Sequence, residues 1–127
     1  MNTKKFWMLA LAMMIVASPV FAGEATQMWR CEMDDDATEE QIEAHAAQWL
    51  KAAKKVEGGE NLEAYVYFPV AVNAMGEMDF MYIVVAPTFE EWGKFWDNYK
   101  DSEAAKMENH ELSVCPDSVL WESVKIK

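Results

Sequence analysis

His45 is the residue of this sequence best suited to chemistry near neutral pH. It lies on the apolar stripe of a predicted helix, between Ile42 and Trp49, so it should face the interior of the domain. There its imidazole could accept a proton from a bound substrate. It could equally be a core histidine that hydrogen-bonds a neighbour. The second histidine, His110, stands in a polar stretch and is expected on the surface.

Arg30 and a group of aromatic residues are the candidates for ligand binding. Arg30, the only arginine, lies in a predicted strand, where it could bind an anionic ligand or pair with Glu32, Glu63 or Glu122 on neighbouring strands. The aromatic residues that could line a pocket with it are Trp49, Tyr65, Tyr67, Trp92 and Trp96. The alternative is that these rings form the core or a dimer interface.

Three methionines, Met75, Met78 and Met81, have the spacing of exported copper-binding segments, and thioethers suit Cu(I). On a strand, however, Met78 and Met81 point to opposite faces, which favours a role in packing. The sequence contains no cysteine–histidine metal cluster, glycine-rich phosphate loop or serine–histidine–acid set. We therefore expect no cofactor and no metal.

The element that must position these residues is a hairpin over residues 61–86. Its first run alternates apolar and polar residues as far as Val72, and its second run, 78–86, is apolar on both faces. Asn73 and Gly76 mark the turn between them. A strand that is apolar on both faces needs two covering layers. The helices of this chain supply one, so a second copy of the chain is expected to supply the other.

Helices and strands on either side of the hairpin complete one small domain. Capping boxes at Thr38-x-x-Gln41 and Thr88-x-x-Glu91 mark two helix starts. The predicted elements outside the hairpin are a strand at 26–33, a helix at 38–56, a helix from 88 to about 99, a further turn at 103–109 and a strand at 119–126, after a loop at 115–118.

The order β-α-β-β-α-β predicts an α+β, ferredoxin-like fold with an antiparallel four-stranded sheet. We expect the strand order 4-1-3-2, with the first and third strands as a parallel pair. Pro69 cannot donate to a neighbouring strand, which agrees with an edge position for the second strand. The order also brings the end of the first strand, at Cys31, to the start of the fourth, after Cys115.

Cys31 and Cys115 are the only cysteines. In an exported protein such a pair predicts a disulfide, which here would close a loop of 84 residues. Two free thiols, or bonds between chains, are the alternatives.

Residues 1–22 read as a secretory signal peptide. Lys4 and Lys5 precede an uncharged apolar run that is too short to span a bilayer, and small residues end at Ala22. Cleavage after Ala25, or retention as a membrane anchor, are the alternatives. Residues 23–127 then form a single domain, and the protein is expected in the periplasm or outside the cell.

The charge of this domain excludes several partners. Without Lys4 and Lys5, 9 basic residues face 22 acidic ones, which gives a net charge of −13. Phosphate backbones and anionic membrane surfaces would be repelled. We therefore expect binding to neither nucleic acid nor, after signal cleavage, a membrane.

In element order, in its two-faced hairpin and in the passage YIVVAPTFEEWGKFW (82–96), the chain resembles the dimeric α+β barrel group. This group of ferredoxin-like domains includes the antibiotic-biosynthesis-type monooxygenases. The resemblance implies a homodimer in which two sheets pack face to face, and a cleft between sheet and helices in each subunit. Some members oxidise aromatic substrates in that cleft without metal or flavin, and others have no known activity.

Three functions therefore remain open from the sequence. The first is an exported, homodimeric module that binds a small apolar or aromatic ligand. The second is a cofactor-independent oxygenase or isomerase that uses His45 as its base. The third is a periplasmic protein that binds copper through its methionines.

Overall fold

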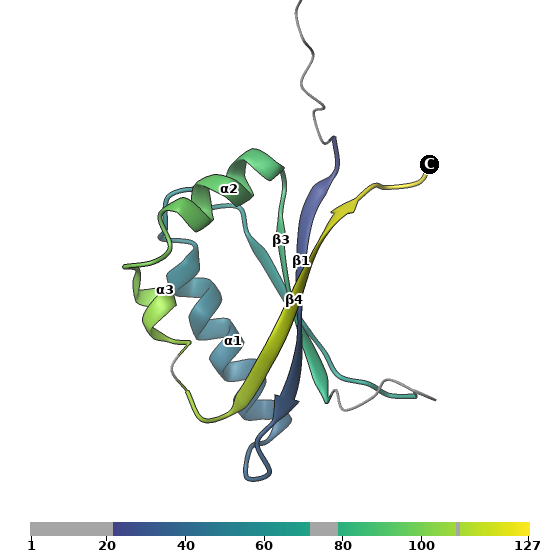
Figure 1. The fold of residues 1–127 in the computed structure, drawn as a ribbon, viewed down its shortest axis with the longest axis vertical. Coiled ribbons are helices and arrows are strands. Elements are labelled where there is room, and N and C mark those ends of the chain that lie inside the picture. Colours follow the sequence, from purple (N-terminus) through teal and green to yellow (C-terminus); the bar gives the residue numbers. More distant parts are fainter. Residues whose placement is uncertain (1–21, 72–78, 109) are drawn as a thin grey trace, which may run out of the picture.

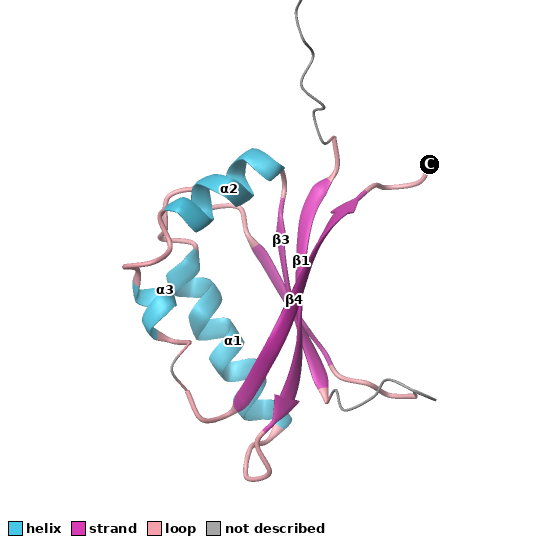
Figure 2. Cartoon of the chain, in the orientation of Figure 1, coloured by secondary structure: helices cyan, strands magenta, loops and turns pink. Residues whose placement is uncertain are grey.

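The computed structural model describes residues 22–71, 79–108 and 110–127 as a twisted sheet with helices on one face (Figures 1 and 2). The elements, in chain order, are β1 (Glu24–Met33), α1 (Glu39–Ala53), β2 (Glu63–Tyr67), β3 (Phe80–Ala86), α2 (Phe89–Asp97), α3 (Glu103–Lys106) and β4 (Ser113–Ser123). The predicted signal segment and the hairpin turn with Asn73 and Gly76 lie outside the described residues.

The strand order is β2-β3-β1-β4, and every neighbouring pair is antiparallel. This confirms the predicted order and the ferredoxin-like α+β fold. The predicted parallel pairing of the first and third strands is wrong. The α1 crossover brings β2 back parallel to β1 but one place away, and β3 fills the gap after the hairpin has reversed the chain direction.

Two predicted boundaries need correction. The segment 115–118 is not a loop, because β4 already begins at Ser113. Pro116 is tolerated there because β4 is an edge strand and because the register with β1 shifts at this point. The strand β2 is the other edge, as predicted, but it ends at Tyr67, so Pro69 lies beyond it.

The helix starts follow the predicted caps. At α1 the hydroxyl of Thr38 accepts from the Gln41 N–H at 3.2 Å, and the Gln41 side chain accepts from the Thr38 N–H at 2.9 Å. At α2 the Thr88 hydroxyl accepts from the Glu91 N–H at 3.1 Å. After α1 the chain turns at Gly58, with φ +93°, and a Cβ there would lie 2.4 Å from the backbone nitrogen of Phe95.

The core between sheet and helices consists of two clusters. The larger surrounds Phe95 and Leu62, beneath α2 and the end of α1. The smaller contains Cys31, Ile42 and Phe80 and lies beneath the start of α1. Trp29 packs against both clusters.

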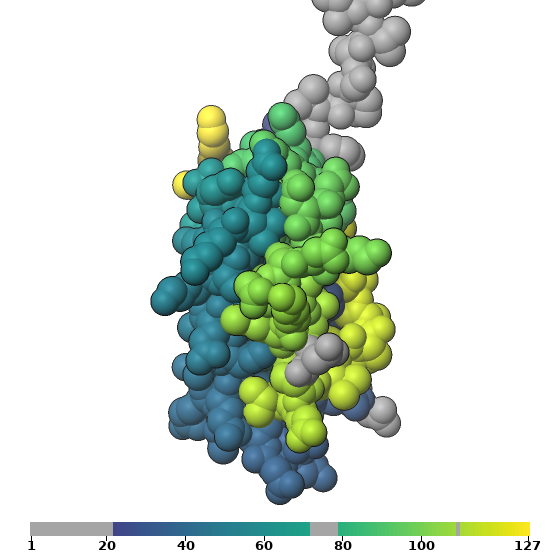
Figure 3. Space-filling view, turned by 90° about the vertical axis from the view of Figure 1, so that its left-hand side faces the viewer, coloured from purple at the N-terminus to yellow at the C-terminus, as the bar shows by residue number. Residues whose placement is uncertain are grey.

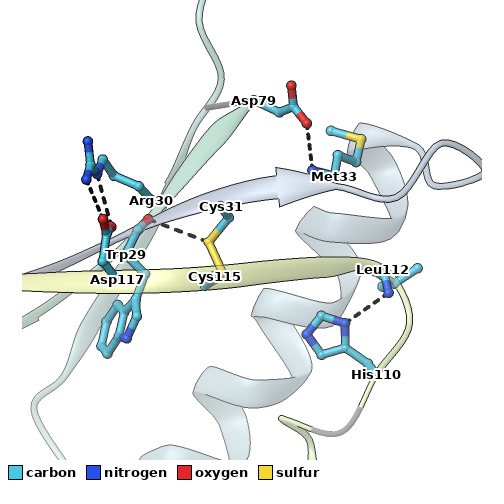
Figure 4. The surroundings of a disulfide bond; sticks show 9 residues. All are labelled: Trp29, Arg30, Cys31, Met33, Asp79, His110, Leu112, Cys115 and Asp117. Carbon is cyan, nitrogen blue, oxygen red and sulfur yellow. Dashed lines mark hydrogen bonds and ion pairs between the residues drawn. A yellow bond between two sulfur atoms is a disulfide. The ribbon is translucent and has the colours of Figure 1, made fainter. Parts of the chain in front are cut away.

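A disulfide joins Cys31 to Cys115 and confirms the predicted pairing (Figure 4). The two Cα atoms are 4.1 Å apart, and the Cys31 side chain is buried in the smaller core cluster. The bond connects the end of β1 to the start of β4, where the topology predicted that the two cysteines would meet.

The face of the sheet opposite the helices is also apolar. By register it presents Met28 of β1, Tyr65 and Tyr67 of β2, Met81, Ile83 and Val85 of β3, and Val119 and Trp121 of β4. We call this set the open face. Tyr67 and Trp121 are more than half exposed, whereas Ile83 at its centre is 1% exposed. The strand β3 is therefore apolar on both of its faces, as expected for the second strand of the hairpin.

Among residues 22–71, 79–108 and 110–127, no helix combines the length and hydropathy that a membrane span requires.

Candidate functional site

A cavity of about 340 Å³ lies between the sheet and the helical layer. Figure 3 views the molecule from the helical side, where α1, α2 and α3 lie together over the sheet. The lining residues come from all four strands, from α1 and α2, and from the connection after α3. They are Trp29, His45, Ala46, Trp49, Ala64, Tyr65, Tyr82, Val84, Trp96, Glu108, His110, Ser113 and Cys115.

The cavity occurs where the two core clusters fail to merge. Trp49, Val84 and Trp96 belong to the larger cluster or pack on it, and Tyr82 and Cys115 pack on the smaller one. The helical layer is thin here, because α3 has only four residues, Glu103–Lys106. The cavity therefore lies between the two core clusters and is bordered by α1.

The indole of Trp49 is held in place by a chain of two hydrogen bonds. Its Nε1–H donates to Tyr99 Oη at 2.9 Å, and the Tyr99 hydroxyl donates to Glu108 Oε1 at 2.9 Å. Burial raises the pKa of Tyr99, so the phenol stays protonated and remains a donor. One wall of the cavity is thus rigid and aromatic.

Two histidines meet at the cavity. The rings of His45 and His110 lie 4.1 Å apart, and both residues are half-buried. His110 Nδ1 accepts from the Leu112 N–H at 3.1 Å, as Figure 4 shows. Burial, and secondarily the neighbouring His45, lowers the pKa of His110. His110 is therefore neutral at pH 7, with its proton on Nε2.

Three lining residues each bury a polar atom that has no hydrogen-bond partner within the described structure: Tyr82 Oη, Trp96 Nε1 and Ser113 Oγ. Burial raises the pKa of the Tyr82 phenol, and the adjacent Ser113 hydroxyl opposes that shift without completing a hydrogen bond of normal geometry. Buried polar atoms without partners are rare in folded proteins and each costs about 1–3 kcal/mol.

Of the residues singled out from the sequence, the fold brings His45, Trp49, Tyr65 and Trp96 to the cavity. Tyr65 of the edge strand borders the cavity, but by register its side chain belongs to the open face, where its hydroxyl donates to Glu63 at 2.8 Å.

Three predicted pocket residues lie elsewhere. Trp92 packs on the larger core cluster and donates to Gln27 Oε1 at 3.2 Å. Tyr67 belongs to the open face. Arg30 lies on that same side of the sheet, where both its Nε, at 3.0 Å, and its terminal nitrogen donate to Asp117.

The expected glutamate partners of Arg30 are therefore wrong. Asp117 was assigned to a loop, and its place in β4, directly opposite Arg30, makes it the partner. The exposed pair raises the pKa of Arg30 and lowers that of Asp117.

Sequence reasoning missed several lining residues. His110 was expected on the surface, but it is half-buried against His45. Glu108 precedes it in the connection between α3 and β4, where no periodic pattern marks an inward side, and Ser113 is the first residue of β4. Tyr82 could have been predicted, because it shares the helix-facing side of β3 with Val84, two residues further along the strand.

The methionine hypothesis gains no support from the described residues. Met81 lies on the open face, and Met75 and Met78 fall outside the described segments. Within those segments there is no group of three histidine, cysteine or acidic side chains that could hold a metal ion.

No protein-family model matches the chain, and no curated protein sequence is significantly similar to it. The chain is similar to solved structures of low identity. One is a dimeric ferredoxin-like protein of unknown function from Thermobifida fusca YX, with 17% identity, a TM-score of 0.48, and coverage of 84% of this chain and 97% of that one.

Structures described as chlorite dismutases or putative chlorite dismutases are also similar. A putative chlorite dismutase, TA0507, has 11% identity and a TM-score of 0.49, over 81% of this chain and 44% of that one. A mutant chlorite dismutase from Candidatus Nitrospira defluvii has 14% identity and a TM-score of 0.43, over 84% and 42%. This chain thus spans less than half the length of the chlorite dismutases that it resembles. The ferredoxin-like fold rests on the strand order, and these similarities do not single out the antibiotic-biosynthesis type.

Proposed function

We propose that this protein is an exported, homodimeric binding module that holds a small apolar or aromatic molecule in the cavity between its sheet and its helices. The observation that carries the proposal is the cavity itself. About 340 Å³ of space, lined by three indoles, lies between the sheet and the helices and is partly open to solvent.

The size and the walls of the cavity define the ligand. A volume of this kind falls at the lower end of small-molecule sites. Trp29, Trp49 and Trp96 offer broad faces for stacking against a flat ring. Neither lysine nor arginine is among the lining residues that the structure describes, and Glu108 adds negative charge. A neutral aromatic molecule therefore fits better than an anionic one.

Filling the cavity with a side chain tests this proposal. Ala46 lines the cavity, whereas Ala47, next to it on α1, is exposed. We expect Ala46→Phe to weaken binding of the neutral dye N-phenyl-1-naphthylamine by at least about tenfold, because the new ring occupies the ligand's space. Dye fluorescence measures the affinity, and thermal unfolding checks that the variants fold.

The matched variant Ala47→Phe should bind the dye as the unmodified protein does. Equal affinity in both variants would place the dye elsewhere on the molecule, and the proposal would then fail.

The open face supports the homodimer. It is an apolar surface on the side of the sheet that the helices leave uncovered. A second copy can present the same surface across a two-fold axis, and sheets pack face to face at about 10 Å through such side chains. This is the second covering layer that the hairpin requires.

Export is supported by the disulfide and by the position of the predicted cleavage site. Disulfides persist in oxidising compartments. Cleavage after Ala22 leaves all of β1 intact, because the strand begins at Glu24. Cleavage after Ala25 would remove a fully buried residue that pairs with Ala86, so the first site is favoured.

The contact between His45 and His110 favours a second candidate, a cofactor-independent oxygenase or isomerase. A neutral His110 beside His45 would let the pair share a proton taken from a phenolic substrate. If the protein is such an oxygenase, oxygen uptake with 2-naphthol should fall to background in His45→Ala, while dye binding persists. Absence of uptake above the rate without protein would leave binding as the function.

A further inference from the structure

The contact between His45 and His110 joins two separate elements at the wall of the cavity. His45 lies on α1 and His110 in the connection between α3 and β4, and their ring centroids are 4.1 Å apart. Both residues are half-buried and line the cavity. A molecule that fills the cavity therefore removes water from both rings.

The surroundings of His110 favour its neutral form. Its Nδ1 accepts from the Leu112 N–H at 3.1 Å (Figure 4). A proton on Nδ1 would turn this acceptor into a donor and break the hydrogen bond. Burial, and secondarily the neighbouring His45, lowers the pKa of His110. Protonation is thus opposed by a hydrogen bond, by burial and by the second ring.

Within the described structure, few charged groups face the pair. One turn to either side of His45, α1 has the uncharged residues Gln41, Ile42, Gln48 and Trp49. These side chains cannot compensate a positive charge on either ring.

The other elements around the cavity add one carboxylate. On β3, burial raises the pKa of the Tyr82 phenol, so it is uncharged at neutral pH. On β4, Cys115 is bonded in the disulfide, and on β2 the Tyr65 side chain belongs to the open face. Glu108 lines the cavity, whereas Glu111 is exposed and outside the lining. Glu108 is therefore the one group of the described lining that would favour a charged histidine.

We propose, on the basis of the binding function above, that protons and the apolar ligand compete for this cavity, so that the His45–His110 pair releases the ligand in mildly acidic solution. A ligand that fills the cavity removes water from the rings, and loss of water disfavours a charged imidazole. The ligand therefore binds the neutral pair more tightly than a protonated pair. By linkage, protonation weakens ligand binding by the same factor by which the ligand weakens protonation.

The dye N-phenyl-1-naphthylamine tests this inference, because its own charge does not change in the pH range used. We expect its dissociation constant for the parent protein to rise at least about threefold from about pH 8.0 to about pH 5.5. In His45→Gln/His110→Asn the constant should change by less than about 1.5-fold, because neither amide takes up a proton. The single variant His110→Asn, whose side-chain oxygen can still accept from the Leu112 N–H, should show a smaller rise than the parent. Circular dichroism checks the fold at both pH values.

Glu108→Gln is the matched control. It removes the carboxylate and keeps a side-chain oxygen that can accept from the Tyr99 hydroxyl. The rise in the dissociation constant should persist in this variant, because the two histidines remain. If the rise disappears here and persists in the double histidine variant, the carboxylate responds to pH and this inference is overturned.

The outcomes separate the two proposals. If the dye does not bind the parent protein at either pH, the proposed binding function fails, and the competition with protons fails with it. If the dye binds equally well at both pH values, or more tightly in acid, the binding function stands and this inference is overturned. A rise of the same size in the parent protein and in the double histidine variant overturns it as well.

Discussion

Replacing both cysteines in Cys31→Ala/Cys115→Ala is expected to lower the free energy of unfolding by about 4.5 kcal/mol. The bond closes a loop of 84 residues, so its removal restores a large conformational freedom to the unfolded chain. The total free energy of unfolding of a natural domain is about 5–15 kcal/mol. Urea denaturation followed by tryptophan fluorescence measures the loss.

Reduction provides the control for this prediction. Dithiothreitol should destabilise the parent protein by a similar amount and leave the alanine variant unchanged, because that variant has no bond to break. If the reduced parent unfolded at the same urea concentration as the oxidised protein, the disulfide would not contribute to stability and the loop-closure argument would be wrong.

Much of the fold was predictable because short stretches of the sequence carry the patterns that define its helices and strands. The caps at Thr38 and Thr88 fix two helix starts, and the alternation in 62–68 separates the two faces of β2. The cysteine pair and the element order then point independently to the same strand neighbours. In the sheet topology, the direction of the β1–β3 pairing was wrong, and that error came from counting chain reversals and not from any residue.

The site was predictable only where its residues lie on regular elements. His45, Trp49 and Trp96 have a helical period that places them on the inner side. Glu108 and His110 follow α3, where the chain has no period to read. The cavity is harder still to predict, because it is the space left between two packed clusters. Its presence depends on tertiary packing, which no local sequence pattern reveals.

The ion pair between Arg30 and Asp117 was missed because of one incorrect strand boundary. Pro116 reads as a loop residue, which removed Asp117 from the strand that faces Arg30. An edge strand with a register shift accepts the proline, and the strand therefore starts earlier than its apolar alternation indicates. Once β4 is extended to Ser113, Asp117 is the residue across from Arg30, and the polar edge of the open face follows from the sequence.

The second prediction concerns the open face. We expect the protein to be a dimer that a single charged substitution on this face dissociates. Trp121 is 57% exposed on this face, although large aromatic side chains of this kind dominate interface energies. We expect Trp121→Glu to raise the dimer dissociation constant by at least about 30-fold, because it removes the indole and sets two like charges across the two-fold axis. Sedimentation equilibrium of residues 23–127 over a range of concentrations measures the constant.

Val70→Glu is the matched control for charge. Val70 is 99% exposed and lies beyond β2, so the same change there adds equal charge without touching the open face. Its dissociation constant should stay within about threefold of the parent value, since an isolated surface charge contributes little at physiological salt. A parent protein that sediments as one chain at all concentrations would contradict the dimer. It would also require that Trp121 and Tyr67 remain exposed to water in solution, a cost that a monomeric domain of this size has no evident reason to retain.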